Sequence, residues 1–188
     1  MTRTTPARLI VLDRDGVINR ESSTFIRNPA EWLPLPGSVQ AIADLTAAGF
    51  EVVVATNQSG VGRGLFTAAT LAAIHERMTK TIEAAGGKLA GIFFCPHRPE
   101  DNCECRKPRA GLMRQIEAQF GTSLRDQPVI GDSCRDLQAA WAVGARAMLV
   151  RTGNGAVTEG RLDADKTVEV FPDLAAAATT LITEKCAS

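Results

Sequence analysis

Short apolar runs that end in polar side chains recur along the chain, and the first of them constrains the fold most strongly. Leu9–Leu12 is a run of four apolar residues, and Asp13, Arg14, Asp15 and Gly16 follow it. A run this short cannot form a helix and is typical of a buried parallel strand. Because ligands of open α/β sheets bind beyond the carboxyl ends of the strands, we expect Asp13 and Asp15 to lie where chemistry takes place. Taken alone, the same residues also fit a plain polar turn.

Strand-like runs alternate with helix-like segments along the chain. The expected strands are residues 9–12, 50–55, 91–94, 128–130, 147–150 and 167–170. Helices are expected from Gly37 to Gly49, from Thr67 to Gly86, and over residues 110–120, 136–143 and 172–185. This alternation predicts an α/β fold, a Rossmann-like three-layer arrangement with a central, mostly parallel sheet and helices on both faces. Residues 19–36 show no clear period, so we expect a long, partly extended loop there.

Length and charge limit the organisation of the chain and its partners. The 188 residues contain no internal repeat or obvious linker, which predicts one domain over residues 1–188. Lys+Arg and Asp+Glu each number 21, so no basic field is present to hold nucleic acid or an anionic membrane. The polar segment 1–8 is neither a signal peptide nor a membrane span, which favours a cytoplasmic location. No heptad or exposed apolar stripe stands out, so a monomer is expected.

Carboxylates gather after two of the expected strands. Asp13 and Asp15 follow the first strand, and Asp132 and Asp136 follow the fourth one, directly after Gly131. Hard oxygen ligands of this kind suit Mg²⁺, which also relieves the repulsion between neighbouring carboxylates. With that charge balanced, one aspartate can attack phosphorus, while Asp15 can protonate the leaving oxygen and later activate water.

Three further side chains could stabilise a phosphoryl group. Thr56 supplies a hydroxyl, Asn57 an amide and Lys107 a positive charge, and phosphoryl transfer depends mostly on positioning and charge of this kind. Each of the three alone is better explained as part of a polar turn or as a solvated lysine. Their combination is more informative, because polar clusters after four strands of one parallel sheet predict a single site at one edge.

Four short motifs, taken in order and spacing, resemble those of the haloacid dehalogenase (HAD) superfamily of phosphatases. They are Asp13-x-Asp15-Gly16, Thr56-Asn57, Lys107 and Gly131-Asp132-x-x-x-Asp136. The resemblance covers nearly the whole chain. It implies Asp13 as the nucleophile and Asp15 as the general acid and base, with Thr56 and Lys107 stabilising the phosphoryl group. It also implies that Mg²⁺ is bound by Asp13, by the backbone carbonyl of Asp15 and by Asp132.

A second cluster of metal-binding residue types precedes Lys107. Cys95, His97, Cys103 and Cys105 place three thiols and one imidazole within eleven positions. Cys₃His is a common tetrahedral zinc set, and in a reducing compartment such a cluster favours metal over disulfide. The set leaves no open coordination position and no nearby base, so we expect a structural Zn²⁺ that staples a proline-rich loop. Thiols brought together by chance are the alternative.

The resemblance is narrowed by the zinc loop and by Cys105-Arg106-Lys107-Pro108, which ends that loop. These segments resemble the heptose-bisphosphate phosphatases of that superfamily, which take part in the synthesis of nucleotide-activated heptose. This resemblance implies a sugar bisphosphate as the small-molecule substrate. The contacts that it implies are Glu21, Ser22, Ser23, Thr24, Thr56, Asn57, Gln58, Ser59 and Arg106. Position 133 is lysine in some of these enzymes, so the role of Ser133 stays open. Cys134 is interpreted as a small packed side chain.

Other functions also fit the sequence. Histidinol-phosphate phosphatases share the zinc loop, and the short spacing from Cys95 to Cys105 resembles theirs as well. Some HAD proteins act on nucleic-acid ends, although zero net charge and few aromatic residues argue against that partner. A non-catalytic interaction module with this fold is a further alternative. Such a protein would normally have lost one of the aspartates or the lysine, and here Asp13, Asp15, Lys107 and Asp132 are all present. The chain has no insertion large enough for a separate cap domain, so we expect an open pocket. The sequence leaves both anomers of the heptose bisphosphate as candidate substrates.

Overall fold

The structure is a computed structural model that describes residues 8–162 and 167–187. Six parallel strands form one sheet in the order β3-β2-β1-β4-β5-β6. The strands are β1 (Leu9–Leu12), β2 (Glu51–Asn57), β3 (Leu89–Cys95), β4 (Pro128–Gly131), β5 (Arg146–Val150) and β6 (Glu169–Phe171). The helices are α1 (Ser38–Ala47), α2 (Ser59–Gly62), α3 (Ala68–Ala84), α4 (Gly111–Phe120), α5 (Cys134–Trp141), α6 (Gly155–Glu159) and α7 (Leu174–Cys186).

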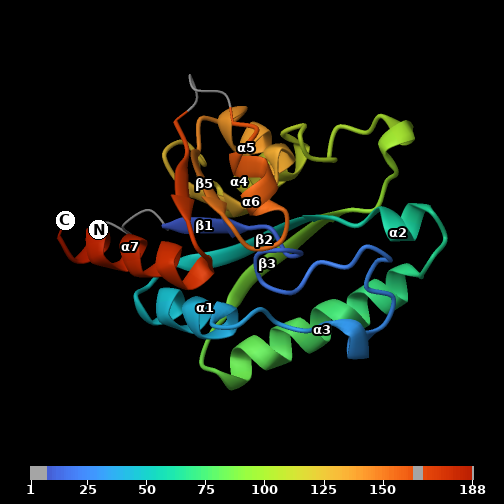
Figure 1. The fold of residues 1–188 in the computed structure, drawn as a ribbon, viewed down its shortest axis with the longest axis horizontal. Helices are drawn as coiled ribbons and strands as arrows, with labels where there is room; N and C mark the ends of the chain where they lie inside the picture. Colours follow the sequence, from blue (N-terminus) through green and yellow to red (C-terminus); the bar gives the residue numbers. More distant parts are fainter. Residues whose placement is uncertain (1–7, 163–166, 188) are drawn as a thin grey trace.

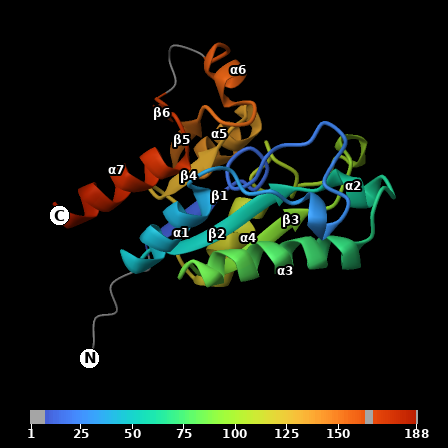
Figure 2. The ribbon, with the colours of Figure 1, turned by 60° about the horizontal axis from the view of Figure 1, so that its bottom comes forward.

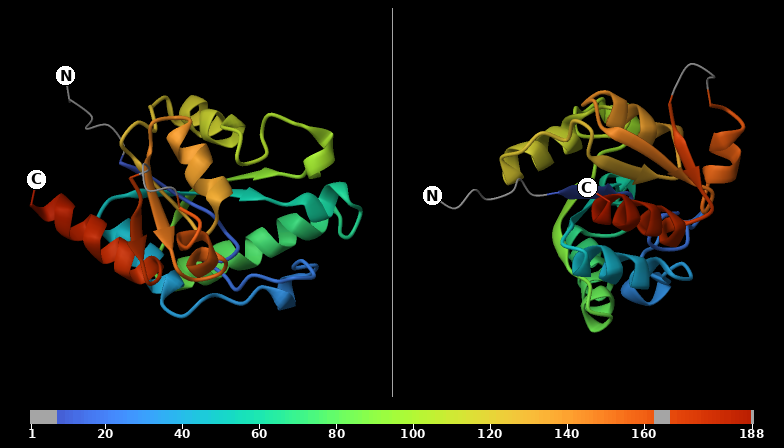
Figure 3. Two further views of the ribbon diagram at one scale, coloured as in Figure 1. Left: turned by 45° about the horizontal axis from the view of Figure 1, so that its top comes forward. Right: turned by 90° about the vertical axis from the view of Figure 1, so that its left-hand side faces the viewer.

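Helices cover both faces of the sheet, as Figure 1 and the right-hand view of Figure 3 show. Helices α1, α3 and α7 lie on one face, and α4 and α5 lie on the other. Strand β1 is fully buried between the two layers: Ile10 and Leu12 face the first core, and Leu9 and Val11 face the second. Side chains of a strand alternate between its faces, so a continuous apolar run is what a strand covered on both sides requires. The predicted α/β fold is therefore confirmed.

The structure differs from the sequence expectation at several boundaries. Strand β2 continues through Thr56 and Asn57, which were expected to follow the strand, because its ladder with β3 extends to Cys95. Helix α5 begins at Cys134, two residues earlier than expected. Helices α2 and α6 were not expected. The last strand, expected over residues 167–170, is found over 169–171. The expectation about segment 1–8 falls almost wholly on residues outside the described part.

Two long connections gather at the carboxyl ends of the strands, above the sheet edge where β1, β2 and β4 stop (Figure 2). The first, residues 13–37, contains the 3₁₀ turn η1 (Pro29–Glu31) and is anchored by Trp32, which is 1% exposed. The second, residues 96–110, contains the 3₁₀ turn η2 (Pro99–Asp101). Among the described residues, no helix has the length and apolar character needed to cross a lipid bilayer.

Candidate active site

Strand β1 delivers Asp13 to the centre of the carboxyl edge, and the chain then turns sharply at Gly16. The Gly16 φ of 79° lies in the left-handed region, where residues with a side chain are strained. A Cβ atom at this position would lie 2.1 Å from Oδ2 of Asp132, which follows β4. Glycine therefore lets the turn after β1 come into direct contact with the aspartate after β4.

Lys107 joins the two carboxylate groups of the site. Its side chain is 2% exposed, and its Nζ lies 2.9 Å from Oδ1 of Asp13 and 2.6 Å from Oδ1 of Asp136. The same Nζ donates a 2.6 Å hydrogen bond to the carbonyl of Ala55 in β2. Burial alone would lower the pKa of Lys107, but the charges of Asp13 and Asp136 outweigh it and raise the pKa above its ordinary value. The lysine is thus held charged, next to the predicted nucleophile.

Three carboxylates lie close to one another at this point of the site. One oxygen from each of Asp13, Asp132 and Asp136 lies within 4.8 Å of the others. Burial, with the charge of Asp13 as the next contribution, raises the pKa of Asp132 to about 8. Burial also raises the pKa of Asp13, reinforced by Asp136 and Asp15 and opposed by Lys107. A cluster whose ionised form is this unfavourable, and whose ligands are all carboxylate oxygens, fits a divalent cation such as Mg²⁺.

The helix after β4 fixes the geometry of Asp136 and explains the role of Ser133. The Ser133 hydroxyl donates a 2.5 Å hydrogen bond to Oδ2 of Asp136, and its backbone N–H donates to the same oxygen at 3.1 Å. The bond from the Ser133 N–H to Asp136 is the side-chain half of a helix capping box, and together the two bonds leave Oδ1 of Asp136 for Lys107. Asp132 is held separately, because its Oδ2 accepts the backbone N–H of Asn154 at 2.8 Å.

The carboxylate of Asp15 accepts hydrogen bonds from a different set of partners from that of Asp13. Arg14, which is 1% exposed, donates to both carboxylate oxygens of Asp15 at 2.9 Å. Asn19 donates to Oδ1 at 2.8 Å, and Gln58 donates to Oδ2 at 2.9 Å. Burial alone would raise the pKa of Asp15, but the charge of Arg14 and these hydrogen bonds lower it. The Asn19 side chain in turn accepts a 3.0 Å hydrogen bond from the Trp32 indole, which connects Asp15 to the buried part of the long loop.

Three cysteines and one histidine, at the end of β3 and in the connection after it, lie close together. The Sγ atoms of Cys95, Cys103 and Cys105 are 3.2–3.5 Å apart, and Nδ1 of His97 lies 3.3 Å from Cys105 and 3.6 Å from Cys95. A disulfide has a sulfur–sulfur distance near 2.05 Å, so these thiols are not bonded to one another. Zn–S bonds of about 2.3 Å in a tetrahedron put sulfurs roughly 3.8 Å apart, so the cluster is close to the size of a zinc site.

The Cys₃His cluster and Lys107, the predicted catalytic lysine, are linked through the backbone. Cys105 precedes Lys107 by two residues, and Arg106 between them donates a 3.2 Å hydrogen bond to the carbonyl of His97. From the other side, the Asn57 amide clamps Lys107. Its Nδ2 donates to the Lys107 carbonyl at 3.0 Å, and its Oδ1 accepts the Lys107 N–H at 3.1 Å. Substrate contact by Asn57 stays a prediction, since the structure uses this amide to position the lysine backbone.

A cavity of about 250 Å³ opens above Asp15 and contains most of the predicted substrate residues. Its lining residues are Arg14, Asp15, Glu21, Ser22, Phe25, Ile26, Asn57, Gln58, Ser59, Arg106 and Arg135. Ser23 and Thr24 line an adjoining, more open hollow of about 690 Å³ instead. Thr56 is 1% exposed, and its hydroxyl accepts a hydrogen bond from Gln58 at 2.9 Å. The structure thus brings six of the predicted contacts into one cavity and places Ser23, Thr24 and Thr56 outside its lining.

Sequence reasoning missed four residues that line this cavity: Arg14, Phe25, Ile26 and Arg135. Phe25 has a φ of 66°, an unusual conformation for an aromatic residue that directs the loop around the cavity. Ile26 is buried in the core beneath the loop. Arg135 lies within the Gly131–Asp136 motif, but an exposed arginine there has no sequence signal that separates it from a solvated one. An arginine directly between two aspartates, as at position 14, is a signal that could have been used.

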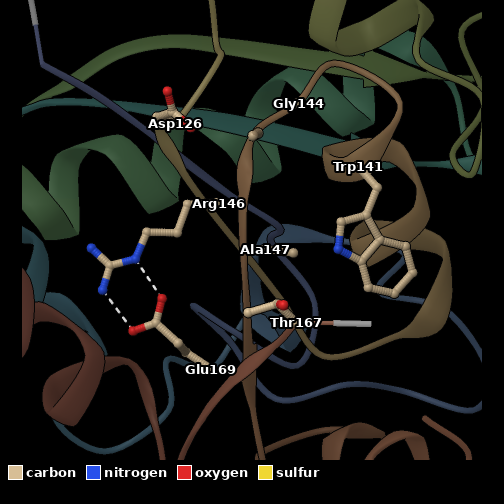
Figure 4. Close-up of a pocket in the computed structure, with 8 residues that line it drawn as sticks. Asp126, Trp141, Gly144, Arg146, Ala147, Thr167 and Glu169 are labelled. Carbon is tan, nitrogen blue, oxygen red and sulfur yellow. Dashed lines mark hydrogen bonds and ion pairs between the residues drawn. The ribbon is translucent and has the colours of Figure 1, made fainter. Parts of the chain in front are cut away.

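A separate hollow of about 470 Å³ lies far from this chemistry, at the amino-terminal ends of β5 and β6 (Figure 4). Trp141 and Thr167 line it together with Arg146 and Glu169, which form an ion pair with each other. Because the predicted catalytic residues all lie at or beyond the carboxyl ends of the strands, this hollow is not part of the candidate active site.

Comparisons with known proteins agree with this geometry. A family model described as HAD-hydrolase-like matches residues 104–177, and a model described as polynucleotide kinase 3 phosphatase matches residues 8–136. A D-glycero-beta-D-manno-heptose-1,7-bisphosphate 7-phosphatase of Bordetella bronchiseptica is 50% identical over 177 residues, covering 94% of this chain and 99% of the relative. An enzyme of the same name from Yersinia pestis is 35% identical over 183 residues, covering 93% of this chain and 95% of the relative.

Solved structures give the same result. The crystal structure of the B. bronchiseptica D,D-heptose 1,7-bisphosphate phosphatase complexed with magnesium and phosphate superposes with a TM-score of 0.92 and 50% sequence identity. The match covers 94% of this chain and 99% of that one. The corresponding phosphatase from Burkholderia thailandensis has a TM-score of 0.75 and 43% identity, over 94% of this chain and 99% of that one.

Proposed function

The chain belongs to the heptose-bisphosphate phosphatases of the HAD-like hydrolases, and from this membership we propose that it removes the 7-phosphate of D-glycero-D-manno-heptose 1,7-bisphosphate during synthesis of nucleotide-activated heptose. The observation that carries the proposal is 50% identity to one such enzyme over 94% of the chain. The site geometry supports it, because Lys107 pairs with Asp13 of the carboxylate cluster, and Asp15, two residues further on, lines a polar cavity.

The reaction would proceed in two steps at Asp13. In the first, a carboxylate oxygen of Asp13 attacks the phosphorus of the 7-phosphate, the bond to the sugar oxygen breaks, and Asp15 gives that oxygen a proton. In the second, Asp15 takes a proton from water, and the water oxygen attacks the aspartyl-phosphate to release inorganic phosphate and restore Asp13. Lys107, held charged by Asp13 and Asp136, stabilises the negative charge of the phosphoryl group in both steps.

The environment of Asp15 suits the second step directly. Arg14, Asn19 and Gln58 favour its ionised form, which is the form that accepts a proton from water. For the first step Asp15 must carry a proton. The entering phosphate brings negative charge next to Asp15, and a nearby like charge raises the pKa of a carboxyl group. We therefore expect substrate binding to adjust the protonation of Asp15.

Two metal ions complete the proposal. Asp13 and Asp132 would bind Mg²⁺ with the backbone carbonyl of Asp15, since the carboxylate of Asp136 is already engaged by Ser133 and Lys107. Bound there, Mg²⁺ would supply charge neutralisation between the nucleophile and the phosphoryl oxygens. Cys95, His97, Cys103 and Cys105 would bind a structural Zn²⁺. A monomeric state, a cytoplasmic location and a single domain over residues 1–188 stay predictions.

Phosphate release in the presence of Mg²⁺ tests the proposal. The substrates to compare are the β and α anomers of heptose 1,7-bisphosphate, histidinol phosphate, and an oligonucleotide with a 3′ phosphate. The last substrate is included because the polynucleotide kinase 3 phosphatase model matches most of the chain. We expect the highest kcat/KM for a heptose anomer, with the β anomer first because the relatives are named for it. A higher kcat/KM for histidinol phosphate or for the oligonucleotide would overturn the substrate assignment.

A further inference from the structure

A bisphosphate carries a second phosphate that must be accommodated while the first one reacts. The Asp13–Lys107 pair can serve only the phosphate that is cleaved, so a second set of cations is needed at the cavity. Three arginines line the cavity: Arg14, Arg106 and Arg135. Their partners decide which of them is available for an anion.

Arg14 is not available, because its guanidinium is buried and donates to both carboxylate oxygens of Asp15. Arg106 donates one Nη1 hydrogen bond to the carbonyl of His97, which orients the side chain without neutralising its charge. Arg135 makes no side-chain hydrogen bond and no ion pair within 4.0 Å among the residues that the structure describes. The charge of Arg135 acts on Glu21, where it opposes the rise in the pKa of that exposed carboxyl group.

Arg106 and Arg135 also line the same two hollows. Both line the 250 Å³ cavity above Asp15, and both line an adjoining hollow of about 300 Å³ next to the zinc loop. Arg135 is exposed, and it lies in α5 next to Asp136, which is 2% exposed and bound to Lys107. The guanidinium is therefore carried by a helix whose first turn is fixed to the catalytic lysine. A planar guanidinium with no carboxylate partner is well suited to bidentate binding of a phosphate.

We propose that Arg135 binds, together with Arg106, the phosphate that stays on the sugar, and so selects bisphosphates over monophosphates. The inference rests on the proposed function and adds to it a residue that the sequence motifs left without a role. Arg135 contacts the substrate at a distance from the reacting phosphorus. Its removal should therefore weaken the reaction of the bisphosphate and leave the reaction of a monophosphate nearly unchanged.

The test compares kcat/KM for heptose 1,7-bisphosphate and for heptose 7-phosphate, which lacks the second phosphate, in the wild type and in Arg135→Gln. One charge-assisted hydrogen bond is equivalent to a factor of roughly ten to a hundred, so we expect a loss of that size for the bisphosphate and less than about a twofold change for the monophosphate. Arg135→Lys should recover part of the loss. Arg114→Gln, in an exposed arginine of α4 that lines none of these cavities, is the matched control and should change neither value.

The outcomes separate the two proposals. Equal losses for both substrates in Arg135→Gln would mean that the arginine supports the fold or the catalytic groups, and would overturn the inference. Unchanged values for both substrates would also overturn it, while the proposed function would stand. A wild type that hydrolyses the monophosphate as fast as the bisphosphate would overturn the inference and leave the proposed function standing, whereas a wild type that hydrolyses neither would overturn the proposed function. Retained monophosphate turnover in Arg135→Gln shows at the same time that the variant is folded.

Discussion

Among the described residues, two clusters could hold a metal ion, and they are built on opposite principles. The carboxylate cluster of Asp13, Asp132 and Asp136 follows strands β1 and β4, whose residues are buried, and it is held by the scaffold. The Cys₃His cluster lies on a connection in which no residue between Cys95 and Lys107 is buried. The first cluster would exist without its metal, whereas the second has only Cys95 in the core, with Cys103 and Cys105 packed against that core from the surface.

This difference indicates what each ion contributes. At the carboxylate cluster, the fold forces like charges together, so that a cation relieves a repulsion that the sheet has already created. At the Cys₃His cluster, the ion would tie the strand end at Cys95 to an exposed loop that is otherwise held by hydrogen bonds such as that from Arg106 to His97, and its binding energy would become folding energy for that loop. Loss of the first ion should therefore affect chemistry, and loss of the second should affect structure first and chemistry second.

The largest effect on kcat is expected for Asp13, the proposed nucleophile. Asp13→Asn should lower kcat by at least about a thousandfold, because an amide cannot form the aspartyl-phosphate. The fold should be retained, since the change removes one of three crowded carboxylates. Phosphate release and thermal unfolding measure the two effects. Asp44→Asn, an exposed carboxylate in α1, is the control and should keep full activity. Turnover near the wild-type level in Asp13→Asn would contradict the assignment.

A smaller effect on activity is expected at the Cys₃His cluster. Cys103→Ser should reduce the zinc content from about one ion per chain, increase tryptic cleavage after Arg106, and lower kcat/KM by roughly ten- to a hundredfold. The loss of activity would follow from misplacement of Arg106, which adjoins Cys105, donates to the carbonyl of His97 and lines the cavity. Elemental analysis, limited proteolysis and kinetics check the three parts. Cys186→Ser, outside the cluster, should behave as the wild type.

The smallest effect concerns stability without Mg²⁺. The pKa of Asp132 is raised from 3.8 to about 8 in the folded chain, so the folded state keeps a proton that the unfolded state releases above pH 4. Its contribution to stability is complete below pH 4 and is lost as the pH rises towards 8. We expect the metal-free protein to lose at least about 1 kcal/mol of unfolding free energy between pH 5 and pH 8.

Urea unfolding at the two pH values, with and without Mg²⁺, measures this loss. Added Mg²⁺ should stabilise the protein more at pH 8 than at pH 5, because it binds the ionised carboxylates. Asp132→Asn removes the titrating group and should flatten the pH dependence. A metal-free protein that is equally stable at both pH values, or more stable at pH 8, would argue against the crowded cluster.

The contrast between the clusters also explains what the sequence could predict. The strands were predictable because residues such as Leu9–Leu12 must be apolar on both faces. The convergence of Asp13, Lys107 and Asp132 followed from the parallel arrangement of those strands. Helix α6 was not predictable from its own sequence. It depends on tertiary contacts, since Thr158 donates to the Asp132 carbonyl and Asn154 donates to the Asp132 carboxylate.

The partners that individual side chains bind could not be predicted from the sequence either. Asn57 belongs to a motif that suggests a phosphate contact, yet both ends of its amide bind the backbone of Lys107. Arg135 is distinguished from other exposed arginines only by the partners that surround it in space. The residue types of the site could be predicted, but the assignment of each hydrogen bond requires the three-dimensional structure.

The amide clamp of Asn57 on Lys107 has a consequence for how such a chain can change over time. Segment 96–106 begins at a buried strand end, Cys95, and ends at a lysine whose backbone is tied to a neighbouring strand. Both ends are therefore fixed independently of what lies between them. Mutation can therefore change the length and charge of this segment to suit another phosphate ester, while Lys107, the proposed catalytic lysine, keeps its position.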